Sequence, residues 1–336
     1  MRRHVPNFTT RPRKMGTRRG ASLHLAPDDN SFGRVYGGLM EKRRLGRTDM
    51  DVTVLGFGGA GTAGEDVEKI RNVLNSALDA GINVIDTAEC YEGSEESIGN
   101  AISKRRTEFF LFTKCGHPRG IGTEDWSGNS ISESIERSLR RLQTDRIDLI
   151  QLHGCSEAVL KKGEAISALE KARERGWVRY LGYSGDGRPA RFAVECDAFD
   201  ALQTSINIAD QEAISQIVPL ARTRNIGLIA KRPLANFAWK TGHKPINSYH
   251  HEYYERLRKL NFDFLRNGSA EESIAIALRF VLSVPGVHTA IVGTTKPERF
   301  QENARLLESR PLPESEYNAI RERWDVIAPK TWIGQP

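Results

Sequence analysis

Four ionisable side chains of different kinds stand at or just after the ends of short apolar segments. Asp86 ends one such segment, and Tyr91 follows it five residues later; Lys114 ends the next segment and His153 the one after that. A carboxylate, a phenol, an ammonium and an imidazole are the groups with which proteins move protons. Each alone is more often a helix cap, a solvated tip or a structural histidine. Together at one place they would indicate acid–base chemistry.

The chain around these residues alternates between short apolar runs and amphipathic stretches. Strands are predicted at 52–58, 82–87, 108–114, 147–153, 178–184, 199–205, 226–232 and 288–294. Helices are predicted at 65–81, 94–106, 129–143, 163–176, 188–195, 211–225, 269–284 and 297–308. Near-continuous runs of Ile, Val and Leu are typical of parallel strands buried on both faces. Eight strand–helix units of this kind predict an α/β fold, the (β/α)8 TIM barrel.

Two segments fall outside this repeat. Residues 41–51 read as a small N-terminal hairpin that could plug the bottom of the barrel. Residues 235–268 form a long loop after the seventh strand, with a helix predicted within 249–265, and loops of that length are usually functional. Because a barrel carries its chemistry at the carboxyl ends of its strands, the four ionisable residues should share one rim.

The basic character of the chain is confined to its first residues. Eight of the 49 basic and two of the 43 acidic residues lie in 1–40, which leaves 41 of each in 41–336. We therefore predict a disordered basic extension, 1–40, and a barrel domain, 41–336. The extension could also be a transit peptide, or translation could begin at Met40. A neutral barrel gives no reason to expect nucleic-acid binding.

The remaining composition is that of an ordinary globular protein. Apolar runs of the length needed to cross a membrane are absent from the sequence, so no membrane partner is expected. The four cysteines form no C-x-x-C pair, which favours reduced thiols and a cytoplasmic location. Cys90, Cys115 and Cys155 stand near the ionisable residues, but their spacing matches no zinc pattern, so no metal is expected.

A second fold is suggested by the glycines of the first unit. Gly56, Gly58 and Gly61 spell G-x-G-x-x-G after a strand, and Asp86 lies where a ribose-binding acid would stand in a Rossmann fold. Two observations count against this fold. The following helix is predicted to begin at Glu65 and not at the third glycine, and eight strand–helix units follow one another without the break expected between the halves of a Rossmann fold. The glycines are then better explained by crowding at a barrel mouth.

Several motifs make the family resemblance specific. The segments "DTAECYEGSEESIG", "LFTKCG", "IDLIQLHG" and "VGTTKPERFQEN" resemble the signatures of the aldo-keto reductase superfamily over roughly 41–310. The resemblance implies a catalytic tetrad made of Asp86, Tyr91, Lys114 and His153. It implies an NADPH-dependent enzyme that reduces a small-molecule carbonyl compound, with Tyr91 as the proton donor. Lys114 would lower the pKa of that phenol, Asp86 would hold Lys114, and His153 would orient the carbonyl.

The same resemblance implies a coenzyme site for NADP(H). A helix start near Pro297, with Lys296 and Arg299 as cations and Thr295 as a hydroxyl, suits the adenosine 2′-phosphate. The cofactor-binding residues carried over are Ser184, Gln203, Lys231, Arg232, Gly293, Thr295, Lys296, Arg299, Glu302 and Asn303.

Two positions depart from the family pattern. Gly185 follows Ser184 where the family usually has Asn, and Lys231 and Arg232 stand where a Tyr commonly stacks under the nicotinamide. Arg232 could stack as a plane, and either cation could reach the pyrophosphate. These departures keep open a non-enzymatic NADP(H)-binding regulatory or sensor subunit, and a different barrel enzyme such as a lyase is a third reading.

The substrate and the oligomeric state are not specified by the sequence. Substrate choice would depend on the loops 116–128 and 235–268 and on the tail 309–336, in which Trp126, Trp239 and Trp332 could line a pocket or simply pack within their loops.

Overall fold

The computed structural model describes residues 40–62, 64–120, 122–308 and 311–335. The predicted basic extension, apart from Met40, lies outside the described residues.

Eight parallel strands form a closed barrel in the described part of the chain. They are β3 (Leu55–Gly58), β4 (Val84–Asp86), β5 (Phe110–Cys115), β6 (Ile147–His153), β7 (Val178–Ser184), β8 (Ala201–Ser205), β9 (Gly227–Lys231) and β10 (Val287–Val292). Each strand pairs with the next along the chain, and β10 closes the ring on β3 with Ala290 opposite Leu55. The predicted (β/α)8 TIM barrel is therefore confirmed, and the closed ring excludes a doubly wound Rossmann sheet.

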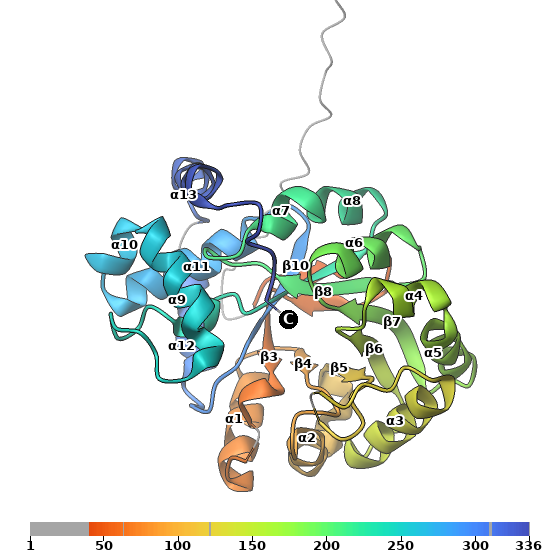
Figure 1. Cartoon of the computed structure of the whole chain (residues 1–336). Coiled ribbons are helices and arrows are strands. Elements are labelled where there is room, and N and C mark those ends of the chain that lie inside the picture. The colour runs from red at the N-terminus through yellow and green to blue at the C-terminus, as the bar shows by residue number, and fades with distance from the viewer. Residues whose placement is uncertain (1–39, 63, 121, 309–310, 336) are drawn as a thin grey trace, which may run out of the picture. The chain divides into compact units, whose positions relative to one another are not determined.

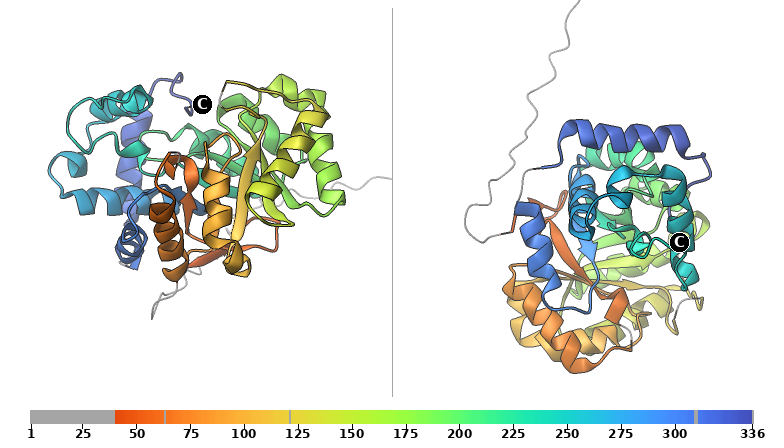
Figure 2. Two further views of the ribbon diagram at one scale, coloured as in Figure 1. Left: turned by 90° about the horizontal axis from the view of Figure 1, so that it is seen from below. Right: turned by 90° about the vertical axis from the view of Figure 1, so that its left-hand side faces the viewer.

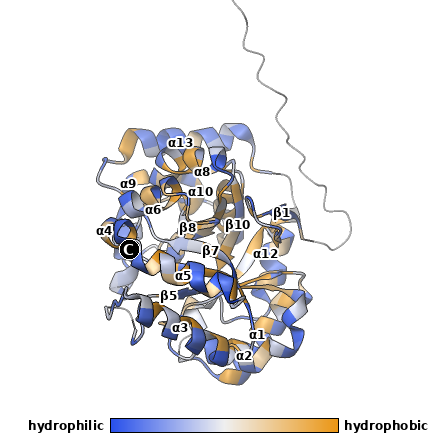
Figure 3. Cartoon of the chain, turned by 90° about the vertical axis from the view of Figure 1, so that its right-hand side faces the viewer, coloured by the Kyte–Doolittle hydropathy of each residue, from blue (hydrophilic) through white to orange (hydrophobic). Residues whose placement is uncertain are grey.

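Helices surround the strands, as Figure 1 shows. They are α1 (Val67–Asp79), α2 (Ser94–Ile102), α3 (Gly128–Arg141), α4 (Glu157–Lys162), α5 (Glu164–Glu174), α6 (Gly187–Glu195), α7 (Glu212–Gln216), α8 (Val218–Thr223), α11 (Ala270–Leu282) and α12 (Arg299–Glu308). Helices such as α3 mix hydrophilic and hydrophobic residues along their length in Figure 3. On α3 the buried positions Ile131, Ser134, Ile135 and Ser138 follow the three-and-four spacing of a helix packed on one side.

The N-terminal hairpin closes the amino-terminal end of the barrel. It consists of β1 (Lys42–Arg44) and β2 (Asp51–Thr53), so the segment predicted as one strand at 52–58 is divided at Val54. The backbone of Val54 serves both parts, because its N–H donates to Glu41 O and its carbonyl accepts from Ala290 N. Leu45, Met50 and Val52 of the hairpin are fully buried with side chains of the strands above.

Further helical segments follow the strands on the β9 and β10 side. The long loop after β9 contains η3 (Ala235–Phe237), η4 (Ser248–His250), α9 (His251–Leu260) and α10 (Asp263–Arg266). The tail contains α13 (Glu314–Ile327), which the sequence analysis did not predict. Figure 2 shows this dark-blue helix, which contacts α9. Its apolar stripe is thin, with only Ile320 and Trp324 buried, which is why periodicity did not reveal it.

Candidate active site

A buried ion pair lies at the ends of β4 and β5. Lys114 Nζ donates to Asp86 Oδ2 at 2.6 Å and to the carbonyl oxygen of Thr87 at 2.8 Å, and both charged side chains are almost inaccessible to solvent. Burial lowers the pKa of Lys114, but the Asp86 carboxylate and the Tyr91 hydroxyl raise it more, so its net pKa lies above the ordinary value. The ammonium therefore stays charged throughout the working range of a protein.

A tight turn brings Tyr91 over this pair. The N–H of Tyr91 donates to Ala88 O, its carbonyl accepts from Ser94 N, and Gly93 leads into α2 with a φ of 69° that favours glycine. Lys114 Nζ lies 5.1 Å from the centre of the Tyr91 ring.

The pKa of Tyr91 differs in part from the expectation that Lys114 would lower it. Burial raises its pKa, and the Lys114 cation opposes this, but the net pKa lies above the ordinary value of a tyrosine. Lys114 thus acts in the expected direction but does not prevail in this arrangement, so the phenol is protonated at neutral pH.

His153 ends β6 beside Tyr91, and the two rings meet edge to face with centroids 5.8 Å apart. His117 Nε2 lies 2.7 Å from the His153 carbonyl oxygen, and Cys90 Sγ lies 3.3 Å from His153 Nδ1. Burial first, and then the electrostatic effects of Lys114, His117, Lys231 and Arg232, hold the pKa of His153 well below its usual range. The imidazole is therefore neutral near pH 7 and can bind an oxygen through one N–H.

Two side-chain amides bind the other carboxylate oxygen of Asp86. Its Oδ1 accepts from Gln151 Nε2 at 3.2 Å and from Gln203 Nε2 at 3.0 Å. Ser184 Oγ donates to Gln203 Oε1 at 3.0 Å, so Ser184 and Gln203 lie together as expected. Gln151 was not predicted from the sequence, although it lies two residues before His153 and therefore on the same face of β6.

Lys231 and Arg232 are held by partners that the sequence analysis did not name. Lys231 Nζ pairs with Asp186 at 2.9 Å, and burial together with the Arg232 cation leaves the pKa of Lys231 below its ordinary value despite Asp186. Asp186 also accepts from Thr204 Oγ1 and from the backbone N–H of Ser205, each at 2.7 Å.

Arg232 is bound to the tail and to the long loop. It donates to the carbonyl of Gln335 at 2.7 Å and to the Tyr249 hydroxyl at 2.7 Å. Both cations thus lie within a network that joins the ends of β7, β8 and β9.

The connection from β10 to α12 presents a different set of groups. Gly293 and Lys296 are exposed, Thr295 is half-buried, and Arg299 pairs with Glu302 at 2.8 Å in the first turn of α12. Asn303 is almost fully buried, and neither atom of its side-chain amide has a partner among the described residues. Cations beside a helix start and an unsatisfied buried amide fit a ligand that has a phosphate and a hydrogen-bonding base.

Of the three loop tryptophans that could line a pocket or pack within their loops, Trp126 is linked to the tetrad through His117. Its ring meets that of His117 edge to face at 5.6 Å, and His117 in turn faces His153 at 5.3 Å. Gly116 has a φ of 111°, and a Cβ there would fall 2.0 Å from the Trp126 ring, so this position requires glycine. Trp239 and Trp332 pack instead on Phe237 and Trp324.

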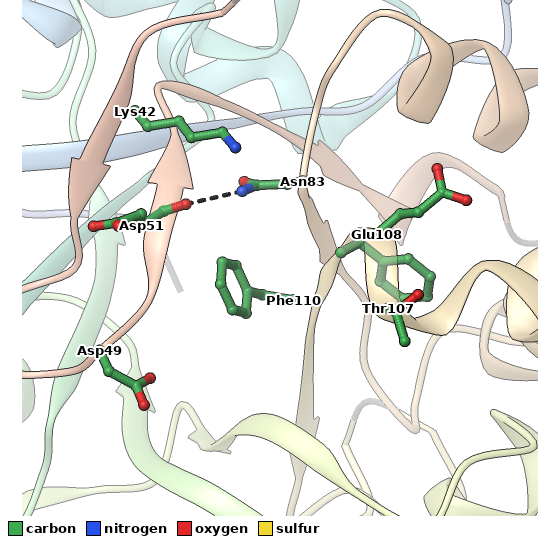
Figure 4. A pocket seen from close by; sticks show the side chains of 8 residues that line it. Lys42, Asp49, Asp51, Asn83, Thr107, Glu108 and Phe110 are labelled. Carbon is green, nitrogen blue, oxygen red and sulfur yellow. Dashed lines mark hydrogen bonds between the residues drawn. The ribbon is translucent and has the colours of Figure 1, made fainter.

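The other end of the barrel contains an open cavity of about 290 Å³. Figure 4 shows its lining, in which the side chain of Asn83 donates to the backbone carbonyl of Asp51. Lys42, Asp49, Thr107 and Glu108 also line it, and all belong to the hairpin or to segments that enter strands. The cavity is therefore remote from the carboxyl ends where the ionisable residues meet.

Within the described residues, no cluster of three or more histidines, cysteines and acids could hold a metal ion. The described helices include none with the length and apolar character of a membrane span. Cys90, Cys115, Cys155 and Cys196 are all unpaired thiols.

Comparison with known proteins agrees with this geometry. The model of the aldo/keto reductase family matches residues 54–325. This chain belongs to the aldo/keto reductase family. An aldo-keto reductase from Bacillus halodurans, solved in a holo form, superposes with a TM-score of 0.74 at 29% identity, covering 84% of this chain and 96% of that one.

The curated relatives of the present chain carry two kinds of name. An uncharacterized oxidoreductase, YqkF of Bacillus subtilis, is 31% identical over 84% of this chain and 96% of its own length. A protein of Arabidopsis thaliana named as a probable voltage-gated potassium channel subunit beta is 29% identical, over 81% of this chain and 93% of its own length.

Proposed function

We propose that the protein is an NADP(H)-dependent oxidoreductase that reduces an aldehyde or ketone to an alcohol. The observation that carries this proposal is the buried Lys114–Asp86 pair beneath the ring of Tyr91, with His153 at its edge. When bound, NADPH would supply a hydride to the carbonyl carbon, and the chain must then deliver a proton to the oxygen.

Tyr91 is the proposed proton donor. Burial keeps its phenol protonated before the reaction, so the proton is available at neutral pH. As the proton leaves, negative charge develops on the phenol oxygen, and the Lys114 ammonium stabilises it from nearby. Asp86 holds that ammonium in place, and solvent reprotonates the phenolate after the alcohol is released.

His153 is the proposed carbonyl-binding residue. A neutral imidazole donates one hydrogen bond without competing with Tyr91 to transfer a proton. Its position beside the Tyr91 ring lets both side chains reach one oxygen atom, which would orient the carbonyl for attack.

The coenzyme would be held at two places. Lys296, Arg299 and Thr295 at the start of α12 are proposed to bind the 2′-phosphate, with Gly293 at the strand end, and Glu302 and Asn303 are proposed to meet the adenine. Ser184 and Gln203 are proposed to hold the carboxamide of the nicotinamide, and Lys231 and Arg232 to lie along the pyrophosphate.

The test combines binding with turnover. NADPH binding measured by fluorescence should be accompanied by NADPH oxidation with at least one member of a panel of aldehydes, ketones and sugars. The relatives named as channel β subunits support a second function, an NADP(H)-binding regulatory subunit. Tight binding without turnover on the whole panel would favour that second function, and the absence of NADPH binding would reject both.

A further inference from the structure

Cys90 directly precedes Tyr91, and its side chain contacts His153. Its Sγ lies 3.3 Å from His153 Nδ1, which is within hydrogen-bonding distance for sulfur. Cys90 is half-buried and unpaired, and the proposed mechanism gives it no role. One nitrogen of the His153 ring is therefore already engaged, and Nε2 is the nitrogen left for a carbonyl oxygen.

We propose that Cys90 is a positioning residue, whose thiol donates a hydrogen bond to Nδ1 of His153 and so keeps the imidazole proton on Nε2. This inference rests on the proposed function, because only a carbonyl-binding His153 needs that proton on Nε2. A carbonyl oxygen accepts hydrogen bonds, so the nitrogen that faces it must donate. A neutral imidazole has one donor, and Nδ1 must then accept.

The protonation states of both partners agree with this direction. Burial raises the pKa of the Cys90 thiol to about 11, so its S–H proton is present at neutral pH. His153 is kept neutral by burial and by groups that face it and lower its pKa, namely Lys114 on β5, His117 on the following loop, and Lys231 and Arg232 at the end of β9. Tyr91 faces the ring as well but stays uncharged.

The backbone and the ring of His153 are fixed separately. The His117 side chain binds the carbonyl of His153, which fixes the main chain where β6 ends. Rotation of the imidazole about its side-chain bonds is opposed by Cys90. Such an outer partner commonly selects the tautomer of a functional histidine, as in metal sites and catalytic triads.

The first test is spectroscopic and does not depend on turnover. In protein labelled with ¹⁵N-histidine, the His153 ring signals are assigned by their loss in His153→Gln. We expect the Nε2–H tautomer in the wild type and in Cys90→Ser, and a mixture of tautomers with a raised His153 pKa in Cys90→Ala. A wild-type ring protonated on Nδ1, or an unchanged tautomer in Cys90→Ala, would overturn the proposal.

The second test is kinetic and uses the NADPH-dependent reduction found in the carbonyl panel. Because a neutral hydrogen bond contributes about 1 kcal/mol, which corresponds to about fivefold, kcat should fall about fivefold in Cys90→Ala. The KM for NADPH should not change, and Cys90→Ser should recover kcat to within about twofold. Cys155→Ala is the matched control, because this buried thiol lies two residues after His153 and its backbone carbonyl, not its thiol, bonds to Tyr183.

The outcomes separate the two proposals. Equal losses of kcat in the serine and alanine variants would show that Cys90 only fills space, and would overturn the positioning role. If no carbonyl compound is reduced, the proposed function fails, while the tautomer measurement still decides whether Cys90 orients His153.

Discussion

The ends of β4, β5 and β6 and the connection from β10 to α12 belong to the same barrel rim, yet their polar groups are paired very differently. Lys114 and Asp86 are buried, and each has more than one hydrogen-bond partner among the strands and strand ends of the barrel. Lys296 is exposed, and the buried amide of Asn303 has no partner among the described residues. The groups proposed to perform the chemistry are thus held in place by the fold, whereas Lys296 and Asn303, which we propose contact the coenzyme, are not.

The largest effect is expected from a substitution among the buried groups at the ends of β4, β5 and β6. Tyr91→Phe removes the proposed proton donor and should lower kcat about 100-fold to 10,000-fold while NADPH binding persists. Steady-state kinetics and fluorescence titration measure the two quantities. Tyr180→Phe is the control, because it removes a hydroxyl that binds Asp49 N at the far end of the barrel. Near-normal turnover by Tyr91→Phe would reject the acid assignment.

The proposed phosphate site at the connection from β10 to α12 is tested by removing its two cations. Lys296→Ala with Arg299→Ala should weaken NADPH binding about 30-fold to 100-fold, because charge-assisted hydrogen bonds to the 2′-phosphate are lost. NADH, which lacks that phosphate, should change less than about threefold on the same scale. Arg305→Ala provides the control on the exposed face of the same helix. Equal weakening of both coenzymes would mean that these cations do not read the phosphate.

A smaller effect is expected from substitution of Lys231, which ends β9. Lys231→Tyr would restore a stacking ring, which is worth about 0.5–1.5 kcal/mol, or roughly two- to tenfold in NADP+ affinity. Because Lys231 pairs with Asp186, the substitution is made together with Asp186→Asn, and Asp186→Asn alone is the control. Binding of 2′,5′-ADP, which has no nicotinamide, should stay constant.

The wild-type comparison of these ligands is informative by itself. If 2′,5′-ADP binds nearly as well as NADP+, the adenosine end supplies most of the affinity. A hundredfold weaker binding of the fragment would show that the nicotinamide pocket is well formed without a stacking aromatic residue.

The smallest expected change concerns pH. The pKa of Tyr91 is raised above its ordinary value and that of His153 is held well below its ordinary value, so we expect neither group to titrate between pH 6 and 9. With NADPH saturating, kcat/KM for reduction should vary less than about twofold in this range, falling only when Tyr91 loses its proton or His153 gains one. A clear midpoint between pH 6 and 9 would show that one of the two pKa directions is wrong.

Local patterns predicted the barrel better than they predicted its connections. β6 and β7 match their predicted ranges because each is a mostly apolar run that ends in a polar residue. The sequence did not show that the segment 52–58 forms two strands, β2 and β3. The hydrogen bonds of Val54, where the two strands separate, are made with Glu41 and Ala290, which lie outside the segment. α13 was missed because it buries little of its surface.

The site shows the same limit. The types and order of Asp86, Lys114 and His153 were sufficient to predict that they share a rim. The residues that hold the site in place were not predicted. Asp186 pairs with Lys231 and Cys90 contacts His153, and in both pairs the two residues follow or end different strands of the barrel. Contacts between residues far apart in sequence depend on how the strands are aligned around the closed barrel, which the pattern of a single segment does not specify.

The pairing of β10 with β3 also has a consequence for folding. These strands are the last and the first of the ring, and some 230 residues separate Leu55 from its partner Ala290. Until β10 is in place, β3 and β9 each expose an unpaired parallel edge, and such edges are sites where chains join one another wrongly. A fragment that stops before Val287 should therefore aggregate instead of forming a smaller stable barrel, and refolding of the whole chain should be slow because its decisive contact is so distant.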